Sequence, residues 1–400
     1  MSVNALASER PGSLATAIPT TLNLCLAAAH LLASLYQLFI LPLFLLPASS
    51  WWLLTLVPLA ALNNPFWSLI HEAIHDMFHP SRRVSRTAGR TLGIFFGAPF
   101  LVLRLSHLLH HKLNRTPVEA TEPYDPAKTS KARAACGYFF QVLGGLYLLE
   151  FISPWLFFLF RRTLHAMERK RFSGNDLPGH LMRGLMRDEA ITEMRIDGAL
   201  ILVLFALSAL SYGAYWPWLV AALLARAFLI SFLDNVYHYG TPINDIFYAR
   251  NLFLSPPLSA GLLYFNLHGI HHKNPSIPWI GLPDAFRKQE AVFEGTYFTA
   301  ALDQLAGPIP LSELPGAAAA SGGMLSIYVG KALASRSQGL VMLAVFLLLY
   351  GLLYLILNLE DYALLAGAIL GFVALTAIMF ATLRVDWSGR GSAPAQVPAE

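Results

Sequence analysis

Residues 51–75 read WWLLTLVPLAALNNPFWSLIHEAIH, an apolar run that ends directly in two histidines. The apolar part, 51–70, has the length that a helix needs to cross a lipid bilayer. His71 and His75 are four residues apart, so a helix places both imidazoles on one face at the end of this span. The stretch therefore predicts a membrane protein with a chemical site at the membrane surface.

The composition of the whole chain also indicates a membrane protein. Its 400 residues are 56% hydrophobic and 13% charged, whereas a typical soluble domain is about 25% charged. The mean hydropathy is +0.52. Only two cysteines are present, Cys25 and Cys136, which excludes a cysteine-rich metal site and gives no disulfide framework. The net charge is +4, and the Lys and Arg residues lie beside apolar segments. This placement is typical of charges that orient a protein in the membrane, and it does not indicate a nucleic-acid partner.

Six apolar segments predict an all-α integral membrane fold built from three transmembrane helical hairpins. They are residues 20–46, 51–70, 197–212, 215–234, 339–359 and 362–383. The turns within the hairpins carry no Lys or Arg, whereas the segments between hairpins are rich in both, for example Arg82, Arg83 and Arg86. By the positive-inside bias, both termini and all long loops are expected to be cytoplasmic.

Three shorter or interrupted apolar stretches do not fit this pattern. Residues 135–160 contain Gly144, Glu150 and Pro154, which are costly or disruptive in a spanning helix, so we expect an interfacial or re-entrant helical segment there. The runs 91–103 and 252–265 are expected to be interfacial.

The expected organisation has five parts. They are an N-terminal cytoplasmic segment (1–19), a membrane domain capped by a cytoplasmic metal site (20–290), a cytoplasmic connector (291–338), an added C-terminal transmembrane hairpin (339–383) and a disordered tail rich in Pro and Ala (384–400).

Two further histidine clusters follow His71 and His75. Each has the pattern HxxHH, in which the first two histidines project together from a helix and the third points in a different direction. Their members are His107, His110 and His111, then His268, His271 and His272, and His238 lies separately at the inner end of the fourth span. All are expected on the same side of the membrane, which predicts a metal site. Imidazoles without thiolates suit iron, copper, nickel or zinc.

A zinc protease is the main competing interpretation. The sequence His71-Glu72-Ala73-Ile74-His75 matches HExxH, in which two histidines bind zinc and the glutamate is the general base. Asp234 is available as a third ligand. This interpretation leaves seven clustered histidines unexplained. A metal-binding membrane scaffold without catalysis is a further alternative.

The histidine arrangement resembles the membrane fatty acid desaturase and hydroxylase superfamily. Members carry Hx3–4H, Hx2–3HH and a late HxxHH, and the resemblance covers roughly residues 20–290. The segment from Asn266 to His272, followed by Pro275, Pro278 and Trp279, is especially similar. In the family an additional histidine completes a nine-histidine di-iron site, and His238 matches it. An Asn one turn earlier often holds a water in the family, and Asp234 stands at that position here.

The resemblance implies two iron ions that activate O2 and a fatty acyl or other lipid-like substrate whose unactivated C–H bond is oxidised. Desaturation is our first choice, and a hydroxylase, a carotenoid-type ketolase or an oxidative fatty acid decarboxylase are alternatives. The chain has no haem-attachment motif, cysteine cluster or dinucleotide motif. A separate ferredoxin or cytochrome b5-like electron donor is therefore expected, docking near Arg161 to Arg171. Those residues could instead bind anionic membrane lipid.

Several other polar residues are candidates for the site. Glu72, Asp76, Asp234, Glu122 and Asp125 are candidates to orient imidazole N–H groups, although the last two are equally well explained as solvated loop charges. His79 and Asn266 are further candidates for a ligand or a supporting contact. Arg226 lies in the middle of the fourth span, where an ionisable residue is expensive, so it is a candidate for substrate contact.

Overall fold

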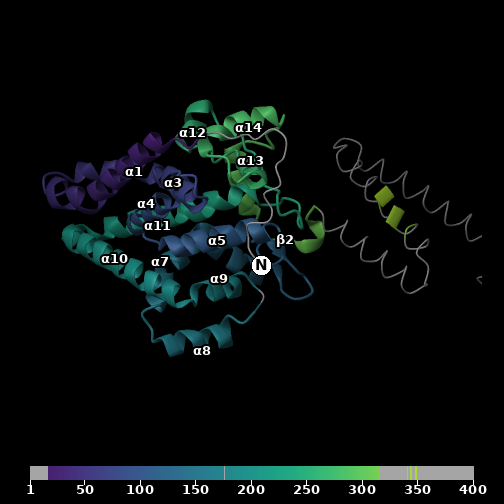
Figure 1. Cartoon of the computed structure of the whole chain (residues 1–400), viewed down its shortest axis with the longest axis horizontal. Helices are drawn as coiled ribbons and strands as arrows, with labels where there is room; N and C mark the ends of the chain where they lie inside the picture. Colours follow the sequence, from purple (N-terminus) through teal and green to yellow (C-terminus); the bar gives the residue numbers. More distant parts are fainter. Residues whose placement is uncertain (1–16, 175, 316–339, 341–342, 345–346, 349–400) are drawn as a thin grey trace, which may run out of the picture. The chain divides into compact units, whose positions relative to one another are not determined.

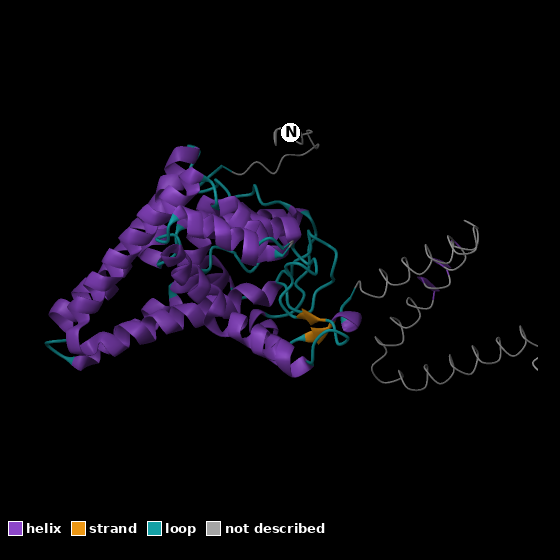
Figure 2. Cartoon of the chain, turned by 90° about the horizontal axis from the view of Figure 1, so that it is seen from below, coloured by secondary structure: helices purple, strands orange, loops and turns teal. Residues whose placement is uncertain are grey.

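The computed structural model describes residues 17–174 and 176–315, together with 340, 343–344 and 347–348. The described part is almost wholly helical (Figures 1 and 2). The α-helices are α1 (Thr20–Leu35), α2 (Leu56–Ala61), α3 (Asn63–Ile74), α4 (Arg82–Phe96), α5 (Phe100–Leu113), α6 (Lys131–Phe140), α7 (Leu146–Leu156), α8 (Arg161–Arg171), α9 (Leu177–Leu185), α10 (Asp188–Tyr212), α11 (Trp216–Asp234), α12 (Pro256–Gly261), α13 (His268–Lys273), α14 (Leu282–Lys288) and α15 (Tyr297–Asp303).

Shorter elements connect these helices. Two are π-helical, η1 (Tyr36–Leu45) and η3 (Gln141–Gly145), and the others are 3₁₀ turns: η2 (Ser50–Thr55), η4 (Gly213–Tyr215), η5 (Asn235–Tyr237), η6 (Trp279–Gly281), η7 (Gln304–Ala306) and η8 (Leu311–Glu313). Among the described residues the only sheet pairs β1 (Pro123–Tyr124) in parallel with β2 (Ile309–Pro310).

Four helical stretches are long and apolar enough to cross a membrane, which agrees with the all-α integral membrane fold. They are Thr20–Leu45, Ser50–Ile74, Lys131–Leu156 and Asp188–Tyr237. The first two agree with the predicted spans 20–46 and 51–70. The last contains both predicted spans 197–212 and 215–234, separated at Gly213, whose φ of 50° ends α10. The predicted spans 339–359 and 362–383 lie outside the described residues, apart from the few positions given above.

The stretch 135–160, expected to be an interfacial or re-entrant helical segment, contains Lys131–Leu156, which qualifies by length and composition as a candidate span. The helix breaks at Gly144, where φ is 139° and ψ is −15°, and then continues as α7. A hydroxyl from α11 satisfies part of the backbone near the break, because Ser231 Oγ accepts a hydrogen bond from the amide of Tyr147 at 3.1 Å. The glycine therefore redirects the helix without ending it, which sequence periodicity alone did not indicate.

The run 91–103 also differs from a simple interfacial segment. It contains the end of α4 and the start of α5, which meet at an angle of 105° and together are apolar enough to be one broken span. Gly97 ends α4 with a left-handed φ of 95°. The bend directs α5 toward α3, so that the second histidine cluster lies beside the first.

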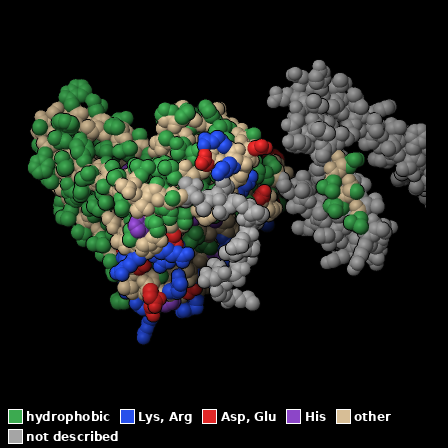
Figure 3. All heavy atoms as spheres, turned by 45° about the horizontal axis from the view of Figure 1, so that its top comes forward, with side chains coloured by type: hydrophobic (Ala, Val, Ile, Leu, Met, Phe, Trp, Pro, Cys, Tyr) green, Lys and Arg blue, Asp and Glu red, His purple; other side chains and the backbone are tan. Residues whose placement is uncertain are grey.

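The main hydrophobic core packs α3, α4, α5 and α11 against one another. It includes Phe66, Ile70, Phe96, Ile230 and Phe265. Apolar side chains also cover much of the outer surface, as expected for helices that face lipid (Figure 3). Lys and Arg side chains gather at the lower edge of this view, where α8 lies in Figure 1, and a smaller charged group lies near α14. The chain divides into two compact units, Met1–Ala317 and Ala318–Glu400, and all the elements given above belong to the first.

Candidate metal centre

The nine histidines of the predicted site lie together in two groups. One group contains His71, His75, His107, His111 and His271, and the other contains His110, His238, His268 and His272. Within each group the nearest ring nitrogens are within 4.8 Å of one another. Each HxxHH cluster contributes to both groups, but the first and third histidines share a group and the second joins the other, so the prediction that the first two project together was wrong.

The ring nitrogens approach one another in a way that hydrogen bonding does not explain. His107 Nε2 is 3.0 Å from Nε2 of both His75 and His111, and His111 Nε2 is also 3.0 Å from His271 Nε2. His71 Nε2 continues this series of contacts and lies 3.0 Å from His271 Nε2. Because a ring nitrogen carries either one proton or one lone pair, it cannot make good hydrogen bonds to two such neighbours. Convergence on a shared cation accounts for the spacing.

The nitrogen spacing also bears on the kind of ion that would fit. In the second group the spacings are 3.2 Å between His110 and His272 and 3.1 Å between His272 and His268. With metal–nitrogen bonds of about 2.1 Å, two ligands at right angles are about 3.0 Å apart, and two at the tetrahedral angle are about 3.4 Å apart. The observed values lie within this range, so the residues present fit a metal ion held by imidazole nitrogens.

Burial keeps the histidines in the form that a metal ion requires. Loss of water lowers the pKa of His238, His268, His271 and His272 well below the usual imidazole value. At neutral pH these rings are therefore uncharged, and each offers a lone pair. Both ring nitrogens of His238 and Nδ1 of His268 are buried and have no hydrogen-bond partner among the described residues.

The first two clusters are held together by Arg104 on α5. Its guanidinium donates to the carboxylate of Asp76 at 3.3 and 3.2 Å. It also donates to the carbonyl oxygen of Ile74, which is left free by the end of α3. Asp76 therefore supports the site by fixing the end of α3 beside α5, since its carboxylate binds Arg104 and has no hydrogen bond to an imidazole.

The third cluster is held by close backbone packing. An added Cβ at Gly269 would lie 2.3 Å from the carbonyl oxygen of Ala249, so only glycine fits between His268 and the neighbouring loop. The side chain of Asn251 in this loop accepts the Ile270 amide at 3.1 Å. Asn266, a candidate ligand, instead donates to the Leu252 carbonyl at 2.8 Å, so the structure places it in the support of the loop.

A buried ion pair holds the segment after His238. Arg115 Nη2 lies 2.7 Å from Glu122 Oε1, and both side chains are almost completely buried. Arg115 also donates to the Thr241 carbonyl at 2.7 Å, and Glu122 accepts the Gly240 amide at 3.0 Å. Glu122 therefore acts on the site through the His238 segment. Asp125, by contrast, pairs with exposed Lys128 at 3.0 Å and lies away from the histidines.

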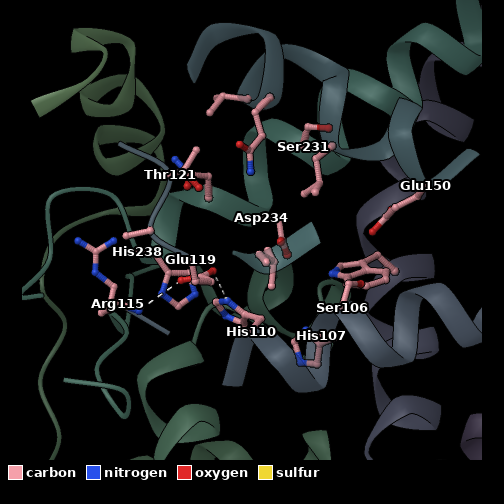
Figure 4. A pocket seen from close by; sticks show the side chains of 17 residues that line it. Ser106, His107, His110, Arg115, Glu119, Thr121, Glu150, Ser231, Asp234 and His238 are labelled. Atoms are coloured by element: carbon pink, nitrogen blue, oxygen red, sulfur yellow. Dashed lines mark hydrogen bonds and ion pairs between the residues drawn. The ribbon is translucent and has the colours of Figure 1, made fainter. Parts of the chain in front are cut away.

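Sequence reasoning missed Glu119, although its carboxylate binds a histidine of the site directly. Glu119 Oε1 is 2.7 Å from His110 Nδ1, and Oε2 accepts the Arg115 amide at 3.3 Å (Figure 4). This contact turns His110 Nε2 toward His272. The only signal in the sequence was an acidic residue shortly after the second cluster, and no helical periodicity connects the two positions.

Two predicted residues lie outside both histidine groups. His79 Nδ1 accepts the Ser81 amide at 2.9 Å and does not face the groups. The buried guanidinium of Arg226 donates to Asn63 Oδ1 at 2.7 Å and to the Phe96 carbonyl at 2.8 Å. Arg226 thus connects α11 with α4 inside the helical core and does not line the cavity beside the histidines.

Glu72 lies behind the first histidine pair. Its Oε1 is 4.0 Å from His71 Nδ1, and its Oε2 accepts the Trp279 amide at 3.1 Å. The Nε2 of His71 faces His271 on the opposite side of the ring. Glu72 therefore connects the first cluster with η6, the turn that follows the third cluster.

A cavity of about 110 Å³ adjoins the histidines. Its lining includes His107, His110 and His238, together with Asp234 and Glu150, which face it from α11 and α7 (Figure 4). A substrate in this cavity would reach both histidine groups, because His107 belongs to the first group and the other two histidines belong to the second.

Two family models match the chain. The model described as fatty acid desaturase matches residues 49–300, well over half of the chain, and the model described as inner membrane protein CreD matches residues 316–388. All nine grouped histidines lie within the first match. The search of curated proteins gave no match, and no solved structure matches either.

Proposed function

Since the chain belongs to the fatty acid desaturase family, we propose that it is a di-iron oxidase that uses O2 to remove hydrogen from an unactivated C–H bond of a fatty acyl or other lipid-like chain, with desaturation as the outcome. Family membership makes it a membrane oxidoreductase of this type. The metal, the reaction and the substrate class are the proposed parts.

The observation that carries the proposal is the pair of histidine groups. Nine imidazoles converge in two groups whose ligand nitrogens lie within 4.8 Å of one another, and eight of the nine have a neighbouring ring nitrogen at 3.0–3.2 Å. His71, His75, His107, His111 and His271 would hold one iron, and His110, His238, His268 and His272 would hold the other. Two ferrous ions bound there would supply O2 activation for hydrogen abstraction.

The protein's own residues prepare the site for this chemistry. Burial keeps His238, His268, His271 and His272 neutral, and Glu119 fixes the ring of His110. Aromatic rings pack against the histidines, since Phe265 contacts His71 and His268 and Tyr237 stacks on His268, and they limit the entry of water. Asp234 and Glu150 line the cavity beside the histidines, where each carboxyl group would offset positive charge when ionised.

The geometry gives the zinc-protease alternative little support. A zinc protease needs Glu72 beside the metal-bound water, but Glu72 lies on the Nδ1 side of His71 and binds the Trp279 amide. His71 Nε2, on the other side of the ring, faces a third histidine cluster that such a protease does not require. Asp234 belongs to neither group of histidines.

We also propose that the metal site and both termini are cytoplasmic and that a separate ferredoxin or cytochrome b5-like protein supplies electrons. The basic helix α8, with Arg161, Arg162, Arg169, Lys170 and Arg171, provides a surface for an acidic donor. Its first residue already pairs with Asp188, which leaves the basic residues near the C-terminus of α8 for the donor.

The test combines elemental analysis with lipid analysis. The purified full chain should contain about two irons, and cells expressing it should accumulate an oxygen-dependent unsaturated lipid that cells expressing His271→Ala lack. If the pure protein contains one zinc and no iron, the di-iron oxidase proposal is wrong and the zinc-protease interpretation takes its place. Two irons with a hydroxylated product would keep the di-iron site and replace desaturation by hydroxylation.

A further inference from the structure

A groove lies between α1 and α4, apart from the cavity beside the histidines. The two helices lie side by side (Figure 1). The groove has a volume of about 480 Å³, within the roughly 300–1,000 Å³ that is typical of small-molecule sites. None of the residues that line it belongs to either histidine group. The groove is therefore a feature that the metal centre does not explain.

Small side chains leave the space between the two helices open. Ala27 and Ala28 on α1 line the groove, and so does Ala88 on α4. Phe78 and Leu92 close it toward the protein interior, since 0% and 1% of these residues are exposed. Most of the lining is therefore apolar, which suits a hydrocarbon chain and not a polar solute.

The outer side of the groove is open to the surroundings of the helices. Leu24 on α1 and Val84 on α4 both line it and are exposed. Because α1 begins a candidate membrane span, the medium around these two side chains is lipid. An acyl chain of a bilayer lipid can therefore enter the groove from the side, without crossing the protein.

One end of the groove lies where both helices begin. Asn23 Nδ2 donates to the carbonyl oxygen of Phe78 at 2.9 Å, and the amide of His79 donates to Ser85 Oγ at 3.1 Å. These two contacts hold the first turns of α1 and α4 beside each other. Arg83, the second residue of α4, lines the groove at this end. Since the candidate span also starts here, the guanidinium lies near the membrane surface, at the level of the lipid headgroups.

The charge of Arg83 is available to a ligand. Arg83 has no acidic partner among the residues that the structure describes, whereas Arg82 Nε lies 3.8 Å from Asp76 Oδ2. A basic side chain at the membrane surface attracts anionic lipid headgroups. An apolar groove with a cation at its headgroup end therefore complements a lipid that has a hydrocarbon chain and a negative headgroup.

We propose that the groove between α1 and α4 binds one acyl chain of an anionic phospholipid of the bilayer, with the headgroup phosphate at Arg83. The other acyl chain remains in the bilayer. The bound chain packs against Phe78, which follows the first histidine cluster by three residues, so the lipid stabilises the contact between α1 and the end of that cluster. The inference concerns a site separate from the metal centre, and it does not depend on the proposed reaction.

Titration with two matched phospholipids tests the inference. Phosphatidylglycerol and phosphatidylcholine with the same acyl chains are added to the full chain in detergent, and bound lipid is counted by native mass spectrometry. Phosphatidylglycerol should have one site that is at least about fivefold tighter than any site for phosphatidylcholine. Ala28→Phe should remove this site, because the ring occupies the groove. Ala29→Phe, at the next position, which is exposed and does not line the groove, should keep it.

A second pair of variants tests the charge and keeps the inference testable if Ala28→Phe does not fold. Arg83→Gln should weaken phosphatidylglycerol binding about fivefold, the effect of one basic residue near an anionic surface. Arg133→Gln removes the same charge from an exposed position on α6 and should leave binding unchanged. Equal affinity for the two lipids, or equal binding by Arg83→Gln and Arg133→Gln, would overturn the inference. Displacement of phosphatidylglycerol by an equal concentration of dodecanoate would instead assign the groove to a free fatty acid.

Discussion

His110 illustrates how a single contact across a loop orients a ring of the site. Its Nδ1 is held by Glu119, nine residues later in the chain, while its Nε2 faces His272. The nine histidines could be selected from the sequence because helical spacing brings the members of each cluster together. Glu119 could not, since the path of the intervening loop depends on Arg115 and Thr116, whose contacts no periodicity describes.

Replacement of Glu119 tests this contact. Glu119→Ala is expected to lower iron affinity or activity roughly 10–100-fold, because loss of the carboxylate frees the ring of His110. Iron content after dialysis against a graded chelator series measures the effect. Asp125→Ala removes a carboxylate six positions later that pairs only with Lys128, so it should match the wild type. If both variants lose iron to the same extent, the effect comes from the general loss of negative charge and not from the contact with His110.

Glu72 and His268 separate the oxidase from the protease. Glu72→Gln keeps an oxygen that can accept the Trp279 amide, so we expect iron to be retained and activity to fall by less than about 100-fold. His268→Ala should lose iron from the second group and lose oxygen-dependent product. Both variants are scored for metal and product. Full metal and full activity in His268→Ala would show that the di-iron assignment is wrong.

At the scale of elements, hydropathy predicted the apolar centres of helices better than their ends. The third span was expected at 197–212, but α10 begins at Asp188, because residues that project beyond the membrane continue the same helix. The interruption expected at Gly144 is confirmed, whereas the break at Gly97 was not anticipated. In both cases a glycine allows a backbone turn and a neighbouring helix determines its direction, which is information that a local sequence does not contain.

The break at Gly144 can be tested with a matched pair of glycines in consecutive elements. Gly144→Ala is expected to destabilise the protein by about 1–3 kcal/mol, because a φ of 139° is unfavourable for any side chain. Gly137→Ala lies in α6 with no neighbour within 4 Å of the added Cβ, so it should be neutral or stabilising by up to about 1 kcal/mol. The stabilities of the two variants are compared by their apparent melting temperatures in the same detergent. A stable Gly144→Ala would mean that the helix can straighten at this point.

At the scale of the whole molecule, the site belongs entirely to the first compact unit. All nine histidines lie within Met1–Ala317 and within the matched desaturase region. The predicted boundary at 290 was placed where the family resemblance ends, and the boundary at 338 was drawn from hydropathy. They remain predictions, because the structure describes the connector only as far as residue 315 and the C-terminal hairpin only at residues 340, 343–344 and 347–348.

Removal of the second unit tests whether the first is sufficient. A chain that ends at Ala317 is expected to insert into membranes, bind the same amount of iron and form the same product as the full chain. Iron per chain and product per iron are measured for both, with His271→Ala in the full chain as the inactive reference. If the shortened chain inserts but binds no iron, the residues after 317 contribute to the metal site.

The contact between His71 and His271 joins residues that are 200 positions apart. At a synthesis rate of about 5–20 residues per second, His271 leaves the ribosome roughly 10–40 s after His71. During that interval neither histidine group is complete, since His271 belongs to one and His268 and His272 belong to the other. Metal loading in the cell must therefore follow translation of the third cluster. A chain whose synthesis stops before residue 268 would have inserted its first helices but could form neither histidine group.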